Sequence, residues 1–561
     1  MTSEVDVPRF SVITPVHDPP VSGLRACADS VFAQSHTDWE WLICDDTSSN
    51  DAVRAVLDDL ALDERVTLIR RETNGGIVAA TNDALSAATG EFLAFLDHDD
   101  LLTAEALTVV DEVLSRDEEI DFVYSDEDKI DEDGNLSQRF SKPAWSPERL
   151  RAQNYCSHLS VMRRSLVNEL GGLRSGFDGA QDYDLVLRVS ERARAIAHIP
   201  RVLYHWRMSV GSTAADADAK PYALEAGRRA VEEHLDRMGI NAEVILTEQR
   251  YLRVRRTPQA TPRVSLIIPT NGARVRVWGQ SLTLVENCVA SIIARSTYPD
   301  IEIVVVHDMI DEALLAKLRA LAGDRLVEVP FDRPFNFSEK INLGVARSSG
   351  CIIVPLNDDT MAASPGWLET LVAHLEETDV GMVGPRLLLA DGRIQSAGHY
   401  NKFGPHHVAA GCAANDTGPF GLLTLASERS GLTLACAALR REVFDEVGGL
   451  SEVFPGAFND VDLAYKLQRA GYRIVWTPEA DLFHFESLSR DPSTKPIELT
   501  HLFERWGVEC ATADWFLPRL DLQMAGAALS DELPVPPQTA NMVLTWRMAQ
   551  IGKPGPRSVT D

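Results

Sequence analysis

The feature that most constrains this sequence is that it contains the same series of segments twice. An early β-branched run, "FSVITPVHDP", has a later counterpart in "RVSLIIPTNGAR". Each run is followed by an amphipathic stretch and then by a second apolar run, "WEWLICDD" in the first copy and "IEIVVVHD" in the second. Alternating strand and helix patterns indicate a mostly parallel sheet covered by helices. The sequence therefore predicts an α/β chain with two similar, Rossmann-like domains.

The repeat extends far enough to set domain boundaries. The stretch "NGGIVAATNDALSAATGEFLAFLDHDD" pairs with "FNFSEKINLGVARSSGCIIVPLNDD", and "GAQDYDLVLRV" pairs with "GAFNDVDLAYKL". The 561 residues also exceed the roughly 250–300 at which a single core stops growing. We expect domains over 1–215 and 262–517, a helical and Arg-rich connector over 216–261, and a C-terminal linker with a short helix over 518–561.

Composition excludes several classes of protein. The net charge of −29 opposes attraction to nucleic acid through the field of the whole molecule. The eight cysteines are scattered without a CxxC pair, which favours free thiols in a reducing compartment. The N-terminus has no signal-peptide pattern, and no apolar run reaches the roughly 18–20 residues that span a bilayer. We expect a cytoplasmic protein.

Two segments are candidates for contact with a membrane or an acceptor. The Arg-rich stretch "RYLRVRRTPQATPRVS" is either a solvated connection or a docking site for a polyanionic acceptor or a membrane face. The C-terminal "ANMVLTWRMAQIG" is either a short helix packed on the body or a membrane or partner contact. Peripheral association with the plasma membrane therefore stays an alternative, and the oligomeric state is not predicted.

The stretch "AFLDHDDLLT" places a cluster of carboxylates directly after an apolar strand. Side chains at the C-terminal ends of parallel strands face the ligand crevice. If the segment is extended, Asp97 and Asp99 point to the same side, and paired carboxylates suit Mg²⁺ or Mn²⁺ bound together with substrate phosphates. Capping of the next helix is the alternative. The recurrence of "LNDDT" in the second copy favours the metal.

Taken together, the motifs resemble those of a known enzyme family. In the first copy they are "SVITPVHDP", "WLICDDTSSND", "TNGGIVAATNDAL", "FLDHDD", "VYSDEDKIDEDG", "GAQDYDLVLR" and "LYHWR"; in the second they are "VSLIIPT", "FNFSEKINLGVA", "PLNDDT" and "FNDVDLAYKLQRAGYRIVWTPEADLFHFES". The chain resembles tandem-domain family 2 glycosyltransferases, which are inverting enzymes with the GT-A fold, of the O-antigen and cell-surface polysaccharide type, rhamnosyltransferase-like.

The resemblance implies a metal-dependent reaction. A sugar would move from a nucleotide-sugar donor, such as a UDP- or dTDP-sugar, to a hydroxyl of a glycan or lipid-linked oligosaccharide acceptor. The expected cofactor is Mg²⁺ or Mn²⁺. The expected place is the cytoplasm, and attachment to the inner face of the plasma membrane is an alternative. Two functions from other classes are alternatives. One is a sugar nucleotidyltransferase, for which "PVHDPPVSG" is a poor fit, and the other is a nucleotide-sugar or glycan-binding scaffold without activity.

Site residues follow from the resemblance, motif by motif. In the first copy, Asp97 and Asp99 would bind the metal and the donor diphosphate, and His205 would complete the metal site. Asp182 matches the general base, and inversion needs such a base on the acceptor side. The positions that match nucleoside contacts are Asp18 and Asp46. Gly75 and Gly76 either contact donor phosphates or merely begin a helix.

The second copy keeps part of this pattern. Gly272 stands where the first copy has Asp18, and Asn357 stands where it has Asp97. Asp308 stands at the nucleoside-side carboxylate and Asp359 at the metal carboxylate. Asp460 stands at the base and His484 at the late histidine. The sequence therefore predicts a bifunctional enzyme with two active sites. The alternative is a catalytic first domain with a degenerate, acceptor- or nucleotide-binding second domain.

Overall fold

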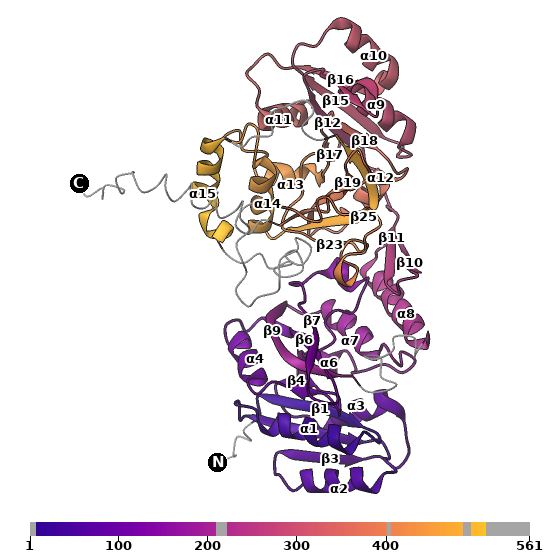
Figure 1. Ribbon diagram of the computed structural model, residues 1–561, viewed down its shortest axis with the longest axis vertical. Coiled ribbons are helices and arrows are strands. Elements are labelled where there is room, and N and C mark those ends of the chain that lie inside the picture. The colour runs from indigo at the N-terminus through magenta and orange to yellow at the C-terminus, as the bar shows by residue number, and fades with distance from the viewer. Residues whose placement is uncertain (1–6, 209–220, 401–405, 486–494, 512–561) are drawn as a thin grey trace, which may run out of the picture. The chain divides into compact units, whose positions relative to one another are not determined.

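The computed structural model describes residues 7–208, 221–400, 406–485 and 495–511. The chain divides into two compact units, Met1–Val254 and Arg255–Asp561 (Figure 1). The segment 216–261 is shared between them, and the expected tail at 518–561 lies outside the described residues. None of the described helices is long and apolar enough to cross a membrane.

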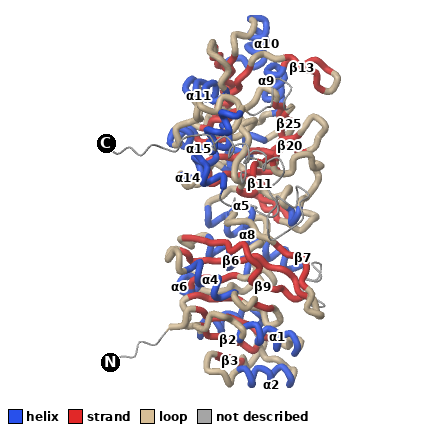
Figure 2. The backbone as a smooth tube through the Cα atoms, turned by 60° about the vertical axis from the view of Figure 1, so that its left-hand side comes forward, coloured by secondary structure: helices blue, strands red, loops and turns tan. Residues whose placement is uncertain are grey.

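The first unit is built on a mixed sheet, which has nine strands over the described residues. Its strand order is β3-β2-β1-β4-β8-β6-β9-β5, with β7 added to β6. Figure 2 shows strands in red and helices in blue. The pairs among β1 to β4 are parallel, and β8 runs antiparallel to both β4 and β6. The strands are β1 Phe10–Val16, β2 Trp39–Asp45, β3 Val66–Arg70, β4 Phe92–Phe95, β5 Leu101–Leu102, β6 Ile120–Ile130, β7 Leu136–Phe140, β8 Ser160–Arg163 and β9 Ala195–Arg207.

Helices cover both faces of this sheet because its strands are apolar on both sides. On β1, Val12 belongs to a core cluster that includes residues of α1, α2 and α4, whereas Ile13 belongs to a cluster that includes residues of α3, α6, α7 and α8. The helices are α1 Val21–Phe32, α2 Asp51–Leu60, α3 Gly76–Ala87, α4 Ala106–Leu114, α5 Pro147–Leu150, α6 Arg164–Glu169, α7 Gln181–Ser190 and α8 Pro221–Met238. A small sheet of β10 Ala242–Leu246 and β11 Leu252–Arg256 follows.

The second unit repeats the same strand order, β16-β15-β12-β17-β24-β19-β25-β18. Helices α9, α10 and α12 share one core cluster with the sheet, and α11, α13 and α14 share the other. The main strands are β12 Val264–Thr270, β15 Ile301–His307, β16 Leu326–Pro330, β17 Ile352–Pro355, β18 Thr360–Ala362, β19 Val380–Leu388, β24 Ala438–Arg440 and β25 Arg473–His484. The helices are α9 Leu284–Arg295, α10 Glu312–Ala322, α11 Phe337–Arg347, α12 Trp367–His374, α13 Arg441–Glu446, α14 Asn459–Arg469 and α15 Pro496–Ala511.

Short strands complete the second unit. They are β13 Arg274–Val277, β14 Gln280–Thr283, β20 Ile394–Ser396, β21 His399–Tyr400, β22 His406–His407 and β23 Ser427–Glu428. β13 and β14 form a separate antiparallel hairpin between β12 and α9. The two units thus share one topology, which confirms the predicted α/β fold class.

Equivalent polar contacts show the duplication at the level of atoms. The Ser11 hydroxyl donates to Glu40 (2.6 Å) and accepts from the amide of Gly90 (2.9 Å). In the second unit the Ser265 hydroxyl donates to Glu302 (2.6 Å) and accepts from the amide of Gly350 (2.8 Å). A Cβ at either glycine would lie 2.6 or 2.5 Å from the serine hydroxyl, so only glycine fits.

Candidate active site

The acidic segment after β4 forms a turn. The amide of Asp100 donates to the carbonyl of Asp97 (3.2 Å), and His98 and Asp99 occupy the middle of the turn. The expectation of an extended segment that aligns Asp97 with Asp99 is therefore wrong. A turn of this kind brings its first and fourth residues together, so Asp97 converges with Asp100 instead.

His158 joins these two carboxylates from the segment before β8. One ligand atom from each of Asp97, Asp100 and His158 lies within 4.8 Å of the other two. We call these three residues the Asp–His cluster. Two carboxylates and an imidazole suit Mg²⁺ or Mn²⁺, so the donor set fits the predicted cofactor.

Asp100 is the most enclosed member of the Asp–His cluster. Its carboxylate accepts hydrogen bonds from the Tyr204 hydroxyl (2.5 Å) and the Arg207 amide (2.7 Å), both from β9. Burial raises the pKa of Asp100 well above its ordinary value, and the neighbouring Asp97 raises it further. A bound cation would offset this repulsion.

His158 is fixed by a buried ion pair. Its ring stacks on Tyr204 with centroids 4.6 Å apart, and its Nδ1 lies 3.4 Å from Glu127. The Lys142 ammonium contacts Glu127 (2.9 Å) and also donates to the carbonyl of His158. Burial lowers the pKa of His158, but Glu127 and the cluster carboxylates outweigh it and raise the pKa to about 9.

The predicted base lies beside the Asp–His cluster at the start of α7. Asp182 accepts a hydrogen bond from the side-chain amide of Asn154 (2.9 Å). Burial raises its pKa, and both His158 and Asp97 are close enough to influence it. Asp184, two residues on, is fully buried and accepts from Arg174 (3.0 Å) and Arg188 (2.9 Å). Asp184 therefore stabilises the fold, and Asp182 alone is available to a substrate.

Two predicted metal ligands lie outside the Asp–His cluster. The backbone carbonyl of Asp99 accepts from Arg207 (2.6 Å). The Nδ1 of His205 lies 2.5 Å from Asp128 on the neighbouring strand β6. Tyr204 faces the cluster, and successive residues of a strand face opposite sides, so His205 points away from it. Metal binding by Asp99 and His205 stays a prediction.

The predicted nucleoside contacts organise loops at the same edge of the sheet. Asp46 accepts from the amides of Gly75 (2.9 Å) and Gly76 (2.7 Å), and Arg71 lies 2.9 Å from it. These two amides therefore bind Asp46 in this structure. Asp18 accepts from Ser49 (2.7 Å) and from the Asn50 amide (2.9 Å), and these bonds lower its pKa to about 2.

The second unit forms the same turn with different side chains. The amide of Thr360 donates to the carbonyl of Asn357 (3.2 Å), so these residues replace Asp97 and Asp100. The β8 and β24 registers place Ala435 at the position of His158. Within the described part of the second unit, no three His, Cys, Asp or Glu side chains converge like the Asp–His cluster.

Strand register also separates the two predicted histidines. Leu101 pairs with His205 in the first unit, and the equivalent Met361 pairs with Phe483 in the second. His484 is therefore one residue beyond the counterpart of His205, and a shift of one residue places a side chain on the opposite face of the strand. Their predicted equivalence is wrong, because sequence spacing does not resolve a shift of one residue.

The remaining polar residues of the second unit make their own contacts. His484 Nε2 lies 3.2 Å from Asp359, and Asp358 accepts from the Thr270 hydroxyl (2.6 Å). Burial raises the pKa of Asp358 to about 7. Asp460 begins α14, as Asp182 begins α7, and lies 4.0 Å from His399.

The predicted nucleoside-side carboxylate Asp308 contacts different groups from its counterpart Asp46. It pairs with the buried Lys340 ammonium (2.5 Å) on α11. The equivalent Asp46 is bound by two backbone amides and an arginine. Different contacts therefore hold Asp46 and Asp308 in the two units.

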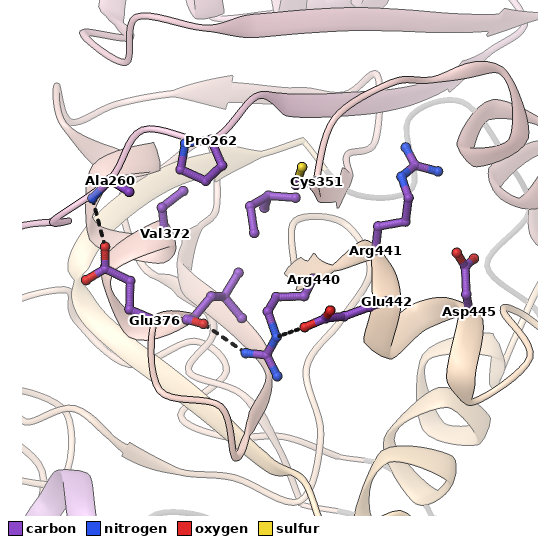
Figure 3. Close-up of a pocket in the computed structure, with 11 residues that line it drawn as sticks. Ala260, Pro262, Cys351, Val372, Glu376, Arg440, Arg441, Glu442 and Asp445 are labelled. Atoms are coloured by element: carbon purple, nitrogen blue, oxygen red, sulfur yellow. Dashed lines mark hydrogen bonds and ion pairs between the residues drawn. The ribbon is translucent and has the colours of Figure 1, made fainter.

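A separate pocket of about 460 Å³ lies in the second unit (Figure 3). Ile352, Val372 and Leu375 contribute apolar walls. Arg440 donates to the carbonyl of Leu375 (2.8 Å), and Arg441 donates to the carbonyl of Gly350 (2.7 Å). None of the predicted site residues lines this pocket, so it is distinct from the candidate active site.

Sequence reasoning missed His158 and underrated Asp100. Asp100 belongs to the quoted acidic run, but the expectation of an extended segment passed over it. His158, in "NYCSHLS", carries no motif signal of its own. A turn signal at residues 97–100 was the available clue to Asp100, and only tertiary structure places His158.

Comparison with known proteins settles the family. The glycosyl transferase family 2 model matches residues 11–171 and 265–448. The chain belongs to glycosyl transferase family 2. This match confirms the predicted family and enzyme class, and it covers both units. Each copy of the turn, at residues 97–100 and 357–360, lies within a matched segment.

Relatives in this family are longer than the chain. It is 40% identical over 541 residues to the protein y4gI of Sinorhizobium fredii, covering 93% of the chain and 59% of that protein. It is 35% identical over 519 residues to the O-antigen biosynthesis protein RfbC of Myxococcus xanthus, covering 92% of the chain and 40% of RfbC. The chain thus spans about half the length of these family 2 relatives.

Solved structures show more distant likeness. Staphylococcus aureus TarS 1-349 in complex with UDP-GlcNAc matches with a TM-score of 0.34 and 21% identity, covering 41% of the chain and 67% of that TarS fragment. GalNAc-T7 with UDP, GalNAc and Mn²⁺ matches with a TM-score of 0.36 and 15% identity, covering 47% of the chain and 51% of that protein. These likenesses are too distant to transfer a residue role to this family 2 chain.

Proposed function

We propose that the first unit is a metal-dependent inverting glycosyltransferase that moves a sugar from a nucleotide-sugar to a hydroxyl of a glycan. The observation that carries the proposal is the Asp–His cluster at the C-terminal end of β4, with Asp182 beside it. A cation site and a separate carboxylate base are the two parts that inverting transfer needs.

The residues would divide the work as follows. Asp97, Asp100 and His158 would hold Mg²⁺ or Mn²⁺, which when bound supplies positive charge opposite the donor diphosphate. Asp182 takes the proton from the acceptor hydroxyl. Its raised pKa makes its carboxylate a stronger base for this proton transfer. Asp46 and Asp18 hold the loops after β2 and before α3 in place for the donor.

The names of two relatives support a proposal for the substrate class. RfbC is named for O-antigen biosynthesis, and a chondroitin synthase of Escherichia coli is 30% identical over 235 residues. We therefore propose a cell-surface polysaccharide or lipid-linked oligosaccharide as the acceptor, at the cytoplasmic face of the plasma membrane, and a UDP- or dTDP-sugar as the donor.

A second transfer activity in the second unit is the other candidate. Asp359, in the turn, lies 3.2 Å from His484, and Asp460 keeps the helix position of Asp182. In the two-site proposal the second unit uses a different donor, because Asp308 contacts different groups from Asp46. Replacement of the Asp–His cluster by Asn357, Thr360 and Ala435 supports instead a second unit that binds the acceptor or a nucleotide.

Separate substitution of the two base positions tests these proposals. A panel of nucleotide-sugars is screened with Mn²⁺ or Mg²⁺, and transfer is followed by nucleotide release for the wild type, Asp182→Asn and Asp460→Asn. We expect Asp182→Asn to lower turnover at least 100-fold, because general-base catalysis contributes about 10²–10⁴-fold. Glu112→Gln on the exposed side of α4 is the control and should keep full activity.

The outcomes separate the candidates. Loss of one transfer in Asp182→Asn and of a different transfer in Asp460→Asn would establish two active sites. Loss of all transfer in Asp182→Asn and none in Asp460→Asn would leave the second unit without catalysis. Full activity in Asp182→Asn would disprove the proposed base.

A further inference from the structure

The β13–β14 hairpin of the second unit has no counterpart in the first. In the first unit β1 ends at Val16 and α1 begins at Val21, which leaves no room for a hairpin. In the second unit the hairpin occupies the interval between β12 and α9, with Trp278 and Gly279 at its turn. The hairpin follows the C-terminal end of β12, and open α/β sheets bind their ligands at the C-terminal ends of their strands.

The backbone holds Trp278 in an unfavourable conformation. Its φ is 49° and that of Gly279 is 77°, the left-handed values required by a two-residue hairpin turn. Gly, Asn and Asp adopt such values readily, whereas a bulky side chain does so at a cost in free energy. The indole is also 54% exposed, so burial does not repay the strain. Such strain is typical of positions where the side chain serves a function.

The indole is nevertheless fixed in position. Its N–H donates to the carbonyl of Ala390 (2.8 Å). Its ring meets those of Phe483 and Phe485 nearly at right angles, with centroids 5.5 and 5.1 Å away. Phe483 and Phe485 are themselves nearly parallel, with an interplanar angle of 13°. We call Trp278, Phe483 and Phe485 the aromatic platform.

The aromatic platform is next to the candidate site of the second unit along the chain, and the side chain of Phe483 faces the side of β25 opposite His484. The amide of Phe485 donates to the carbonyl of Asp359 (2.9 Å). Between the two phenylalanines lies His484, which contacts Asp359 and Asn357. Arg274 and Arg276, both exposed, lie on the same hairpin. An exposed aromatic ring is therefore held at the substrate edge of the sheet, with hydrogen-bond donors nearby.

We infer that the aromatic platform binds a saccharide ring of the acceptor glycan. The C–H groups on one face of a pyranose carry partial positive charge, and they stack on the electron-rich face of an indole. Because the ring is already fixed, binding loses little side-chain entropy. The inference rests on the proposed function for the identity of the ligand as an acceptor, and the stacking itself is tested without catalysis.

The test uses simple glycosides with the full-length protein. Saturation-transfer difference NMR is recorded with methyl β-D-glucopyranoside, methyl β-D-galactopyranoside and methyl α-L-rhamnopyranoside at millimolar concentration. We expect the ring protons of at least one glycoside to receive saturation, with at least a fivefold loss in Trp278→Ala. Trp278→Phe should retain most of the signal, because it keeps an aromatic face. Leu62→Ala, an 86% exposed position of the first unit, is the control.

Three further measurements make the result decisive. An unchanged Tm of Trp278→Ala shows that its fold is intact. If Trp278→Ala is unfolded, the glycoside signals of Trp278→Phe are compared with those of the wild type instead. Metal-dependent hydrolysis of the donor should be equal in all variants, so its absence from the wild type would count against the proposed function alone. Co-sedimentation with vesicles of phosphatidylethanolamine and phosphatidylglycerol should not depend on Trp278.

Two results would overturn the inference. One is a saturation signal that is absent from the wild type or equal in Trp278→Ala. The other is loss of vesicle binding in Trp278→Ala with unchanged glycoside signals, which would assign the hairpin to a membrane surface.

Discussion

Single residues decide which carboxylates converge after β4, where we propose a metal site. Asp97 and Asp100 converge because a turn joins them, and Asp99, between them, uses its backbone carbonyl to bind Arg207. The sequence motif alone favours Asp97 and Asp99, since it records spacing and not the turn. The structure therefore ranks Asp100 above Asp99 as a ligand.

This ranking gives a direct prediction for metal affinity. Asp100→Asn should weaken Mn²⁺ binding more than tenfold, because it removes a charged ligand from the Asp–His cluster, while Asp99→Asn should change it less than threefold. Binding is measured by electron paramagnetic resonance of free Mn²⁺ during titration of each variant. Equal losses in both variants, or a larger loss in Asp99→Asn, would restore the ligand set expected from the motif.

At the scale of elements, one carboxylate ties three strands together below the site. Asp121 on β6 accepts from Arg163 at the end of β8 (2.7 Å) and from Arg194 before β9 (2.7 Å). Burial opposes its ionisation, but the two guanidinium groups outweigh burial and lower the pKa of Asp121 to about 2. Glu127 lies on β6, His158 lies just before β8, and Tyr204 lies on β9. The contacts of Asp121 therefore support the Asp–His cluster indirectly.

The depressed pKa predicts how stability depends on pH. A carboxylate with a lowered pKa stabilises the fold above its unfolded value, here 3.8, and that contribution disappears as pH falls toward about 2. Asp121→Ala should cost about 2–3 kcal/mol at pH 7, because it removes hydrogen bonds between charged groups. Differential scanning calorimetry should show the gap in Tm between variant and wild type closing between pH 4 and 2; a constant gap would contradict the assignment.

The elements were predictable and their registers were not. Hydrophobic patterns in "SVITPV" and "WLICDD" suffice for β1 and β2, and the repeat suffices for the common topology. Leu101 pairs with His205 and Met361 with Phe483, a difference of one residue that no periodicity reveals. His158 reaches the site from a segment without a motif, because tertiary packing brings it there. Asp182 was predictable, since its motif fixes it at a helix start.

At the scale of the whole molecule, each unit has core clusters of its own. One pair of clusters contains only residues of the first unit, and another pair contains only residues of the second. The division falls at Val254 and Arg255, within β11. Each unit therefore contains the apolar contacts that a folded domain requires.

This organisation predicts that the activities can be separated. A fragment of residues 1–256 should unfold cooperatively on heating and bind Mn²⁺ with the affinity of the full chain, because the Asp–His cluster lies entirely within it. The complementary fragment should lack this Mn²⁺ site. Circular dichroism and the Mn²⁺ titration check both points. A fragment 1–256 that is unfolded, or that binds Mn²⁺ more than tenfold more weakly, would show that the units depend on each other.

The contact of Ser11, Glu40 and Gly90, repeated by Ser265, Glu302 and Gly350, lies at the start of the strands, opposite the ligand edge. The two copies have kept it atom for atom while the Asp–His cluster changed. The contact that both copies share thus lies at one end of each sheet, and the side chains in which the copies differ lie at the other. A chain arranged in this way can acquire a new specificity in one copy by mutation at the ligand edge without losing the ability of either copy to fold.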